Sequence, residues 1–155
     1  MSDQSASTHL ARPGDTIAVA SDHAGYDLKI VLAEDLKAMG FKVLDLGANG
    51  LESVDYPDFG KALGEAVTRG RASAGVAICG TGIGISIAAN RIPGARAALV
   101  HDRNTAALAR EHNDANILAM GARILPTDEA RELLKIFLAT PFGGGRHARR
   151  VAKLG

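Results

Sequence analysis

The sequence predicts an α/β fold in which a parallel sheet carries helices on both faces. Short apolar segments, typical of buried strands, alternate along the chain with longer segments whose apolar residues recur at helical spacing. The connections between these segments are short, and the chain shows no internal repeat and no linker. Strict alternation of strands and helices with short connections is the pattern of a parallel sheet covered on both sides. We therefore expect one domain of this class.

Each element can be located along the chain from its own signals. Five segments are expected to be strands: 16–20, 41–46, 75–78, 95–100 and 117–120. Helices are expected over 26–39, 57–69, 85–90, 104–111, 128–139 and 146–153. Gly40 is expected to stop the first helix, Pro57 to open the second and Thr127 to cap the fifth.

The composition bounds the kind of protein. With 155 residues, 46% of them hydrophobic and 23% charged, the chain matches one soluble globular domain. A net charge of +1 argues against a dedicated nucleic-acid binder, and no apolar run approaches the roughly 20 residues of a membrane span. The single cysteine rules out an internal disulfide and fits a reducing cytoplasm. Residues 1–15 lack a signal-peptide segment and are expected to be a flexible tail, with the domain over 16–155.

The segment from Cys79 to Gly84 carries the strongest functional signal. Three glycines at alternate positions leave the backbone amides free to face an anion, and the helix behind adds its positive N-terminal end. A thiolate is favoured at such a position and would serve as a base. Two interpretations stay open: a base beside an oxyanion cradle, or a tight turn with a buried structural cysteine. Ile85 and Ile87 exclude a dinucleotide-binding fingerprint, and no Lys-Ser/Thr pair follows that would make a Walker A loop.

Other polar pairs follow predicted strands. Asp22-His23, the segment after residue 78 and His101-Asp102 all come directly after strands, so we expect them at the carboxyl edge of the sheet, where ligands bind in such folds. Asp22 could instead cap the helix that follows it. His112 closes another predicted helix, where an imidazole also suits the helix dipole.

Metal and hydrolase sites find no support in the sequence. His23 and His112 are far apart in sequence and neither has a second ligand at metal spacing, and no G-x-S-x-G segment is present. Arg146 and Arg150, four residues apart on one helical face, could grip a phosphate, although a solvated basic tail is the common outcome for such a run.

Taken together, six segments resemble the family of ribose-5-phosphate isomerase B, which also holds the allose-6-phosphate and galactose-6-phosphate isomerases. The resemblance runs from Ile17 to about Val151. It rests on segments 21–25, 55–57, 79–90, 112–116, 121–123 and 144–147. Each segment alone is weakly specific, whereas all six in order are highly specific.

The resemblance implies a Rossmann-like three-layer αβα sandwich with a five-stranded parallel sheet, and a homodimer or dimer of dimers with sites at the subunit interface. It implies aldose–ketose isomerisation without metal or other cofactor. Cys79 matches the base that moves a proton through an enediolate, and His112 matches the acid that helps open the sugar ring. Asp22 and His23 match substrate-binding and ring-opening positions, and Thr81 lies near the transferred protons. The remaining matched contacts are Gly80, Thr81, Gly82, Ile83 and Gly84 for the oxyanion, and Asn113, Arg123, Arg146 and Arg150 for sugar and phosphate.

A second form of the family replaces the cysteine by a Glu at the position of Ile85, so this sequence resembles the cysteine form. The expected function is a cytoplasmic isomerase that interconverts ribose 5-phosphate and ribulose 5-phosphate in the pentose phosphate pathway. Its expected partners are the sugar phosphate and a second copy of the chain, with no nucleic acid and no membrane. An isomerase of allose 6-phosphate, galactose 6-phosphate or a tetrose phosphate, and a non-catalytic sugar-phosphate-binding module, remain alternatives.

Overall fold

A five-stranded parallel sheet forms the centre of the computed structural model, which describes residues 9–155. The strands are β1 (Thr16–Ser21), β2 (Lys42–Asp45), β3 (Ala74–Cys79), β4 (Ala97–Leu99) and β5 (Ile117–Gly121). They lie in the order β2-β1-β3-β5-β4, and every neighbouring pair is parallel. The predicted parallel α/β sheet is therefore confirmed.

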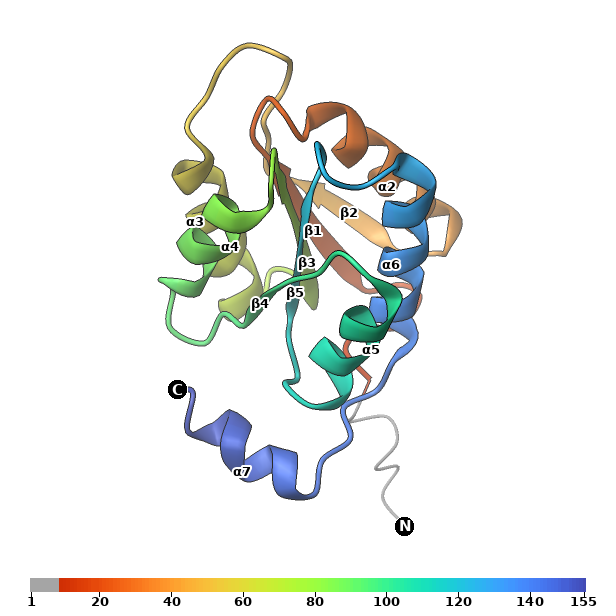
Figure 1. Cartoon of the computed structure of the whole chain (residues 1–155), viewed down its shortest axis with the longest axis vertical. Coiled ribbons are helices and arrows are strands. Elements are labelled where there is room, and N and C mark those ends of the chain that lie inside the picture. The colour runs from red at the N-terminus through yellow and green to blue at the C-terminus, as the bar shows by residue number, and fades with distance from the viewer. Residues whose placement is uncertain (1–8) are drawn as a thin grey trace.

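The described residues form six helices: α2 (Tyr26–Ala38), α3 (Tyr56–Thr68), α4 (Ile83–Asn90), α5 (Arg103–Glu111), α6 (Thr127–Ala139) and α7 (Arg146–Ala152). Figure 1 shows α3 and α4 on one face of the sheet and α2, α5 and α6 on the other, which completes the expected three-layer sandwich. None of the helices over residues 9–155 has the length and apolar character needed to cross a bilayer.

The predicted helix signals were mostly placed correctly. Gly40 follows the end of α2 in the left-handed conformation, at φ +95°, as a helix-stopping glycine should. Pro57 lies in the first turn of α3. The predicted Thr127 cap was wrong, because Pro126 occupies the cap position of α6 and Thr127 is already the first helical residue.

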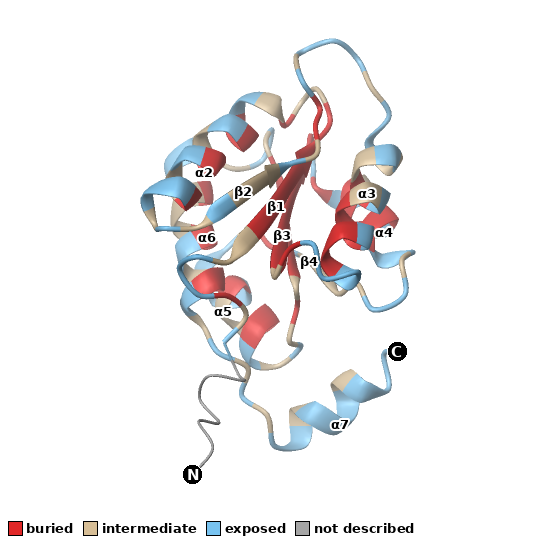
Figure 2. Cartoon of the chain, turned by 180° about the vertical axis from the view of Figure 1, so that it is seen from behind, coloured by how far each residue is buried: buried red, intermediate tan, exposed pale blue. Residues whose placement is uncertain are grey.

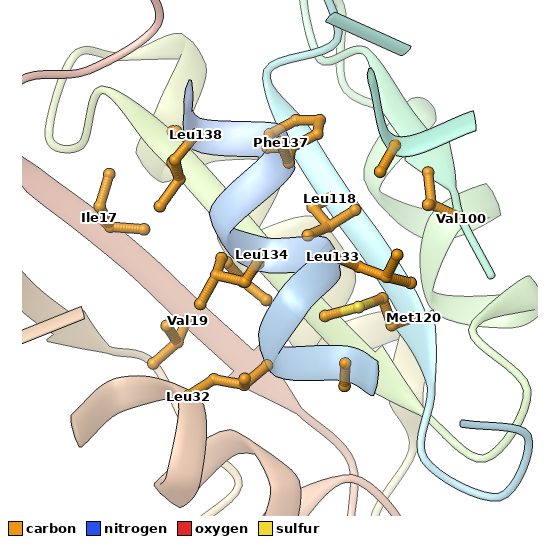
Figure 3. Close-up of a cluster of buried hydrophobic side chains, with 14 of the residues drawn as sticks. Ile17, Val19, Leu32, Val100, Leu118, Met120, Leu133, Leu134, Phe137 and Leu138 are labelled. Carbon is orange, nitrogen blue, oxygen red and sulfur yellow. The ribbon is translucent and has the colours of Figure 1, made fainter. Parts of the chain in front are cut away.

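The core is divided by the sheet into two apolar clusters, because successive strand residues point to opposite faces. Ile17 and Val19 face α2, α5 and α6, whereas Ala18 and Ala20 face α3 and α4. In Figure 3 the leucines and Phe137 of α6 contact Leu118, Met120 and the β1 side chains. On β1, β3 and β5 the second face carries mainly alanine and glycine, and a Cβ at Gly75 would lie only 3.0 Å from the Leu63 side chain of α3.

Part of the predicted flexible tail packs on the domain. Ala11 joins the larger core cluster, and the Gly14 amide donates to the carbonyl of Gly40 at 2.9 Å. The expectation of a tail up to residue 15 was therefore wrong for residues 11–15, which close over the end of α2. Residues 1–8 lie outside the described residues, and their part of the tail stays a prediction.

Helix α7 stands apart from the rest of the fold. None of its residues is buried, and Figure 2 shows it as an exposed helix that projects below the sheet. It lies at the opposite end of the molecule from the loop that precedes α3 (Figure 1). The predicted basic C-terminal helix is thus present, and no other element within residues 9–155 forms a layer over it.

Glycine is required where α3 crosses α4. A Cβ at Gly60 would lie 2.8 Å from both the Ala88 Cβ and the Ile85 carbonyl oxygen, so an added methyl group has no room. We predict that Gly60→Ala lowers the free energy of unfolding by about 1–3 kcal/mol, the range for overpacked cores. This opposes the gain of about 1 kcal/mol that alanine normally brings to a helix.

Chemical denaturation measures the effect, and Lys61→Ala is the matched control. Lys61 is exposed on the same helix, so its replacement should change the unfolding free energy by less than about 0.5 kcal/mol. A Gly60→Ala protein as stable as the control would show that α3 and α4 are not in tight contact.

Candidate active site

The carboxyl edge of the sheet gathers most of the predicted polar residues. Asp22 and His23 follow β1, the segment 79–84 ends β3 and enters α4, and His101 follows β4. Because all strands are parallel, these ends lie at one edge. The expectation that they share this edge is confirmed.

The thiol of Cys79 lies in the turn that starts α4. Its Sγ accepts a hydrogen bond from the amide of Gly82 at 3.2 Å, and the residue is only 5% exposed. Gly82 caps α4 with φ +79°, and a Cβ there would lie 2.7 Å from the carbonyl carbon of Met120. Glycine at 82 therefore allows both the left-handed turn and the close approach of β5. The helix begins at Ile83, two residues earlier than predicted.

Several amides of this turn remain available to a ligand. The Ile83 amide donates to the Oγ1 of Thr81 at 3.2 Å, which closes the turn. Among residues 9–155, the amides of Thr81 and Gly84 have no hydrogen-bond partner. Free amides at a helix N-terminus, in a glycine turn, favour an anionic group. The turn thus combines a sulfur and anion-binding donors within six residues.

Asp22 and His23 fix the segment that leaves β1. The Oδ1 of Asp22 accepts from the Gly25 amide at 3.1 Å, so this carboxylate holds the turn into α2, although Gly25 itself is the cap residue. The Nδ1 of His23 accepts from the Val54 amide at 3.1 Å. The proton of the neutral imidazole is then on Nε2, and the loop before α3 is anchored to this edge.

Arg123 reaches the same edge from the turn after β5. Its amide donates to the Gly80 carbonyl at 2.9 Å. Its guanidinium lies against Gly80, where a Cβ would come within 3.2 Å of Nη1. A cation is therefore placed beside the glycine turn, as the candidate phosphate contact requires.

Tyr56 is a neighbour of the turn that the sequence did not single out for a role. A Cβ on Gly84 would collide with the Tyr56 ring, so the ring packs directly on the start of α4. Asp55-Tyr56-Pro57 was one of the matched segments, and that match was the available signal.

Asp102 serves α5 and not the thiol. It caps this helix, since the Thr105 amide and hydroxyl donate to its Oδ1 at 2.7 and 2.9 Å. The backbone hydrogen bond from Thr105 is the main reason that the pKa of this carboxyl is lowered, and the Thr105 hydroxyl adds to it. The His101-Asp102 pair therefore divides into a cap and a separate imidazole.

A second group of predicted residues lies at the opposite edge. Helix α5 runs back across the sheet, and His112 caps its C-terminus. Asn116, just beyond it, accepts from the Gly75 amide at the start of β3. Asn113 lines a groove of about 500 Å³ together with Arg96 and the C-terminal Leu154. His112 and Asn113 thus lie beside residues at the amino ends of the strands.

Helix α7 is joined to this second group by stacked imidazoles. The rings of His112 and His147 lie 4.3 Å apart between centroids and 16° from parallel. Desolvation lowers the pKa of His147, and the nearby His112, Arg146 and Arg150 lower it further. In the described part of the chain, neither arginine forms an ion pair, so both guanidiniums are free to bind an anion.

One chain therefore does not bring all predicted site residues together. Those at the carboxyl edge are Asp22, His23, Cys79, Gly80, Thr81, Gly82, Ile83, Gly84 and Arg123. Those at the amino edge are His112, Asn113, Arg146 and Arg150. Arg123 and Asn113, both matched to sugar and phosphate contacts, lie at opposite edges of the sheet, so one chain alone does not bring them into one pocket. Over residues 9–155, no three His, Cys, Asp or Glu side chains come together as metal ligands would.

Comparisons with known proteins agree with this fold. The ribose/galactose isomerase family model matches residues 17–154. A putative sugar phosphate isomerase of Bacillus subtilis is 46% identical over 139 residues, which cover 89% of this chain and 93% of that protein.

Solved structures align equally fully. The ribose-5-phosphate isomerase B of Clostridium thermocellum has a TM-score of 0.89 at 52% identity, over 90% of this chain and 95% of that one. The Mycoplasma genitalium ribose-5-phosphate isomerase B, solved with bound ribulose-5-phosphate, has a TM-score of 0.87 at 42% identity, over 90% and 93%. Together with the family model, this similarity shows that the chain belongs to the ribose/galactose isomerase family.

Proposed function

We propose that this protein interconverts ribose 5-phosphate and ribulose 5-phosphate through an enediolate, with Cys79 as the base. The observation that carries the proposal is the Cys79 turn, in which the sulfur accepts the Gly82 amide and the Thr81 and Gly84 amides stay free. Relatives named ribose-5-phosphate isomerase B, one of them with bound ribulose-5-phosphate, favour this pair of sugars. The cytoplasm, where a lone thiol stays reduced, is the proposed compartment.

The chemistry needs one proton to move between neighbouring carbons and a second to move between the oxygens that they carry. The Cys79 thiolate takes the proton from the carbon next to the carbonyl, and the electron pair of that C–H bond forms the double bond of the enediolate. The carbonyl oxygen gains the negative charge, which the free amides of Thr81 and Gly84 stabilise. The hydroxyl proton on the carbon that lost its hydrogen then passes to the former carbonyl oxygen, so that this carbon becomes the new carbonyl, and the thiol returns its proton to the former carbonyl carbon. No metal and no second reactant enter this balance.

We infer that a complete site is built from two copies of the chain. A base at the carboxyl edge cannot meet a ring-opening acid at the amino edge of the same sheet, whereas His112 of a second copy can approach it. Helix α7 leaves the body of the fold with no buried residue, which suits a segment that packs on a partner. Ile83 and Ile87 of α4 are each 51% exposed beside the turn and, with Leu99 of β4, offer an apolar surface for that partner.

The phosphate would be held by cations from both copies. Arg123 supplies one guanidinium beside Gly80, and the unpaired Arg146 and Arg150 of a second copy supply two more. Phosphate is bound far from the reacting carbons, so these contacts hold the open-chain sugar in place during proton transfer.

An isomerase assay across ribose, allose, galactose and tetrose phosphates tests the substrate. Ribose 5-phosphate should give the highest kcat/KM. Cys79→Ala should bind the sugar phosphate nearly as well as the unchanged protein, while kcat falls by a factor of roughly 100 or more, the scale of a lost general base. Iodoacetamide should inactivate the unchanged protein by alkylating its only cysteine, and ribose 5-phosphate should protect it.

Two results would contradict this part of the proposal. If the protein is well folded and isomerises none of these sugars, the isomerase proposal fails. The alternative of a non-catalytic sugar-phosphate-binding module would then fit better. Substantial turnover by Cys79→Ala would assign the base to another residue at the same edge, and Asp22, the carboxylate directly after β1, is the first candidate.

Mixing two inactive variants tests whether sites are shared. Cys79→Ala and His112→Ala proteins are denatured together and refolded, so that mixed dimers form. If Cys79 and His112 serve one site from different copies, a mixed dimer contains one intact site and part of the activity returns. Each variant refolded alone is the control. A mixture as inactive as its components would mean that each site is built within one chain.

Helix α7 offers a matched pair of arginines for the phosphate contact. Arg150→Ala should weaken binding of ribose 5-phosphate by about 1.5–3 kcal/mol, the range for hydrogen bonds to charged groups, while unphosphorylated ribose is bound as before. Arg149→Ala removes the adjacent exposed charge from another face of α7 and should leave binding unchanged. Equal losses in both variants, measured by calorimetry, would indicate general electrostatic attraction and no specific contact.

A further inference from the structure

We propose that His101 is a positioning residue that fixes the Cys79 turn through the amide of Gly121. Gly121 ends β5, His101 lies in the segment after β4, and the Nε2 of His101 accepts from the Gly121 amide at 3.2 Å. The His101 side chain forms no hydrogen bond with the Cys79 sulfur or with the free amides of the turn, so its effect is exerted through the backbone of β5. The catalytic part of this inference rests on the proposed function.

The first step of the argument is that His101 completes the sheet. The Val100 amide donates to the Ala119 carbonyl at 3.0 Å, which is the last backbone bond between the β4 side and β5. Two residues further along β5, the Gly121 amide donates to an imidazole where a strand carbonyl would otherwise stand. Gly121 is buried, so without His101 its amide would lose its partner away from water.

The second step is that Gly121 and its neighbours support the Cys79 turn. The Ala122 amide donates to the Cys79 carbonyl and the Arg123 amide to the Gly80 carbonyl, both at 2.9 Å. At Gly121 the end of β5 is in contact with the Cys79 turn, since a Cβ there would lie 2.6 Å from the carbonyl carbon and oxygen of Thr81. A shift of Gly121 therefore moves both the turn that holds the thiol and the backbone that carries Arg123.

The third step concerns the imidazole itself. To accept from an amide, Nε2 must be unprotonated, so the neutral ring carries its proton on Nδ1. A side chain with a carbonyl oxygen at a similar reach can replace this acceptor, whereas an apolar side chain of similar size cannot. Glutamine and leucine thus separate the hydrogen bond from the volume of the ring.

The test compares His101→Gln with His101→Leu. In His101→Leu, kcat for ribose 5-phosphate should fall by about tenfold or more while KM changes by less than about twofold, because a 1 Å misplacement of a reacting group costs on the order of 100-fold. His101→Gln should stay within about threefold of the unchanged kcat. Amide hydrogen exchange should show a faster Gly121 amide in the leucine variant and a protected one in the glutamine variant.

Each contrary outcome overturns a different part. An equally protected Gly121 amide in His101→Leu would show that the imidazole does not hold it. A faster amide with unchanged kcat would show that the bond has no bearing on the reaction. If His101→Leu does not fold, His101→Asn takes its place with the same expectations, because its side chain is too short to put an acceptor where Nε2 lies in the unchanged protein. If the unchanged protein isomerises no sugar phosphate, the proposed function fails, and the exchange comparison still decides whether His101 holds Gly121.

Discussion

The close approach of two backbone turns at the carboxyl edge is the constraint on which the rest of the site depends. The turn after β3 and the turn after β5 are joined by amide–carbonyl bonds from Ala122 and Arg123, and neither Gly82 nor Gly121 has room for a side chain. This contact sets where the Cys79 sulfur lies, which way α4 points and where the Arg123 guanidinium rests. Glycine is needed at positions 82 and 121 for steric reasons alone, whatever reaction the site performs.

Much of the fold could be predicted because its signals are local. Buried strands are short apolar runs, and α2 shows its apolar stripe and its stop at Gly40 directly in the sequence. The placement of Asp22-His23 and His101-Asp102 at the carboxyl edge followed from these elements alone, since each pair stands directly after a predicted strand. The Thr127 cap was wrong because α6 begins one residue earlier than cap preference indicates: Pro126 takes the cap position without a side-chain hydrogen bond, and Thr127 is already helical.

The site was harder to predict than the fold because its contacts join distant segments. The bond from Gly121 to His101 spans 20 residues, and the bond from Val54 to His23 spans 31, so no spacing in the sequence indicates them. The separation of His112 from Cys79 could have been derived. A helix that follows a parallel strand returns to the amino edge, so a residue at its C-terminus cannot share the edge where the strand ended. The six matched segments named the candidate residues and gave no sign of this separation.

The electrostatics of α7 suit a binding role in the proposed assembly. His147 stacks on His112 between two unpaired arginines, and its pKa is lowered in the folded protein by desolvation and then by the charges around it. A histidine whose folded pKa is lowered contributes stability above its unfolded pKa, and this contribution is lost as the pH falls through the folded value. The stack is therefore favoured at neutral pH, where His147 is uncharged and the positive charge of α7 stays on its guanidiniums. A phosphate bound between Arg146 and Arg150 would offset their charges, and so would reduce the part of the His147 pKa lowering that these two charges cause. The imidazole stack would then respond to the ligand that the arginines are proposed to hold.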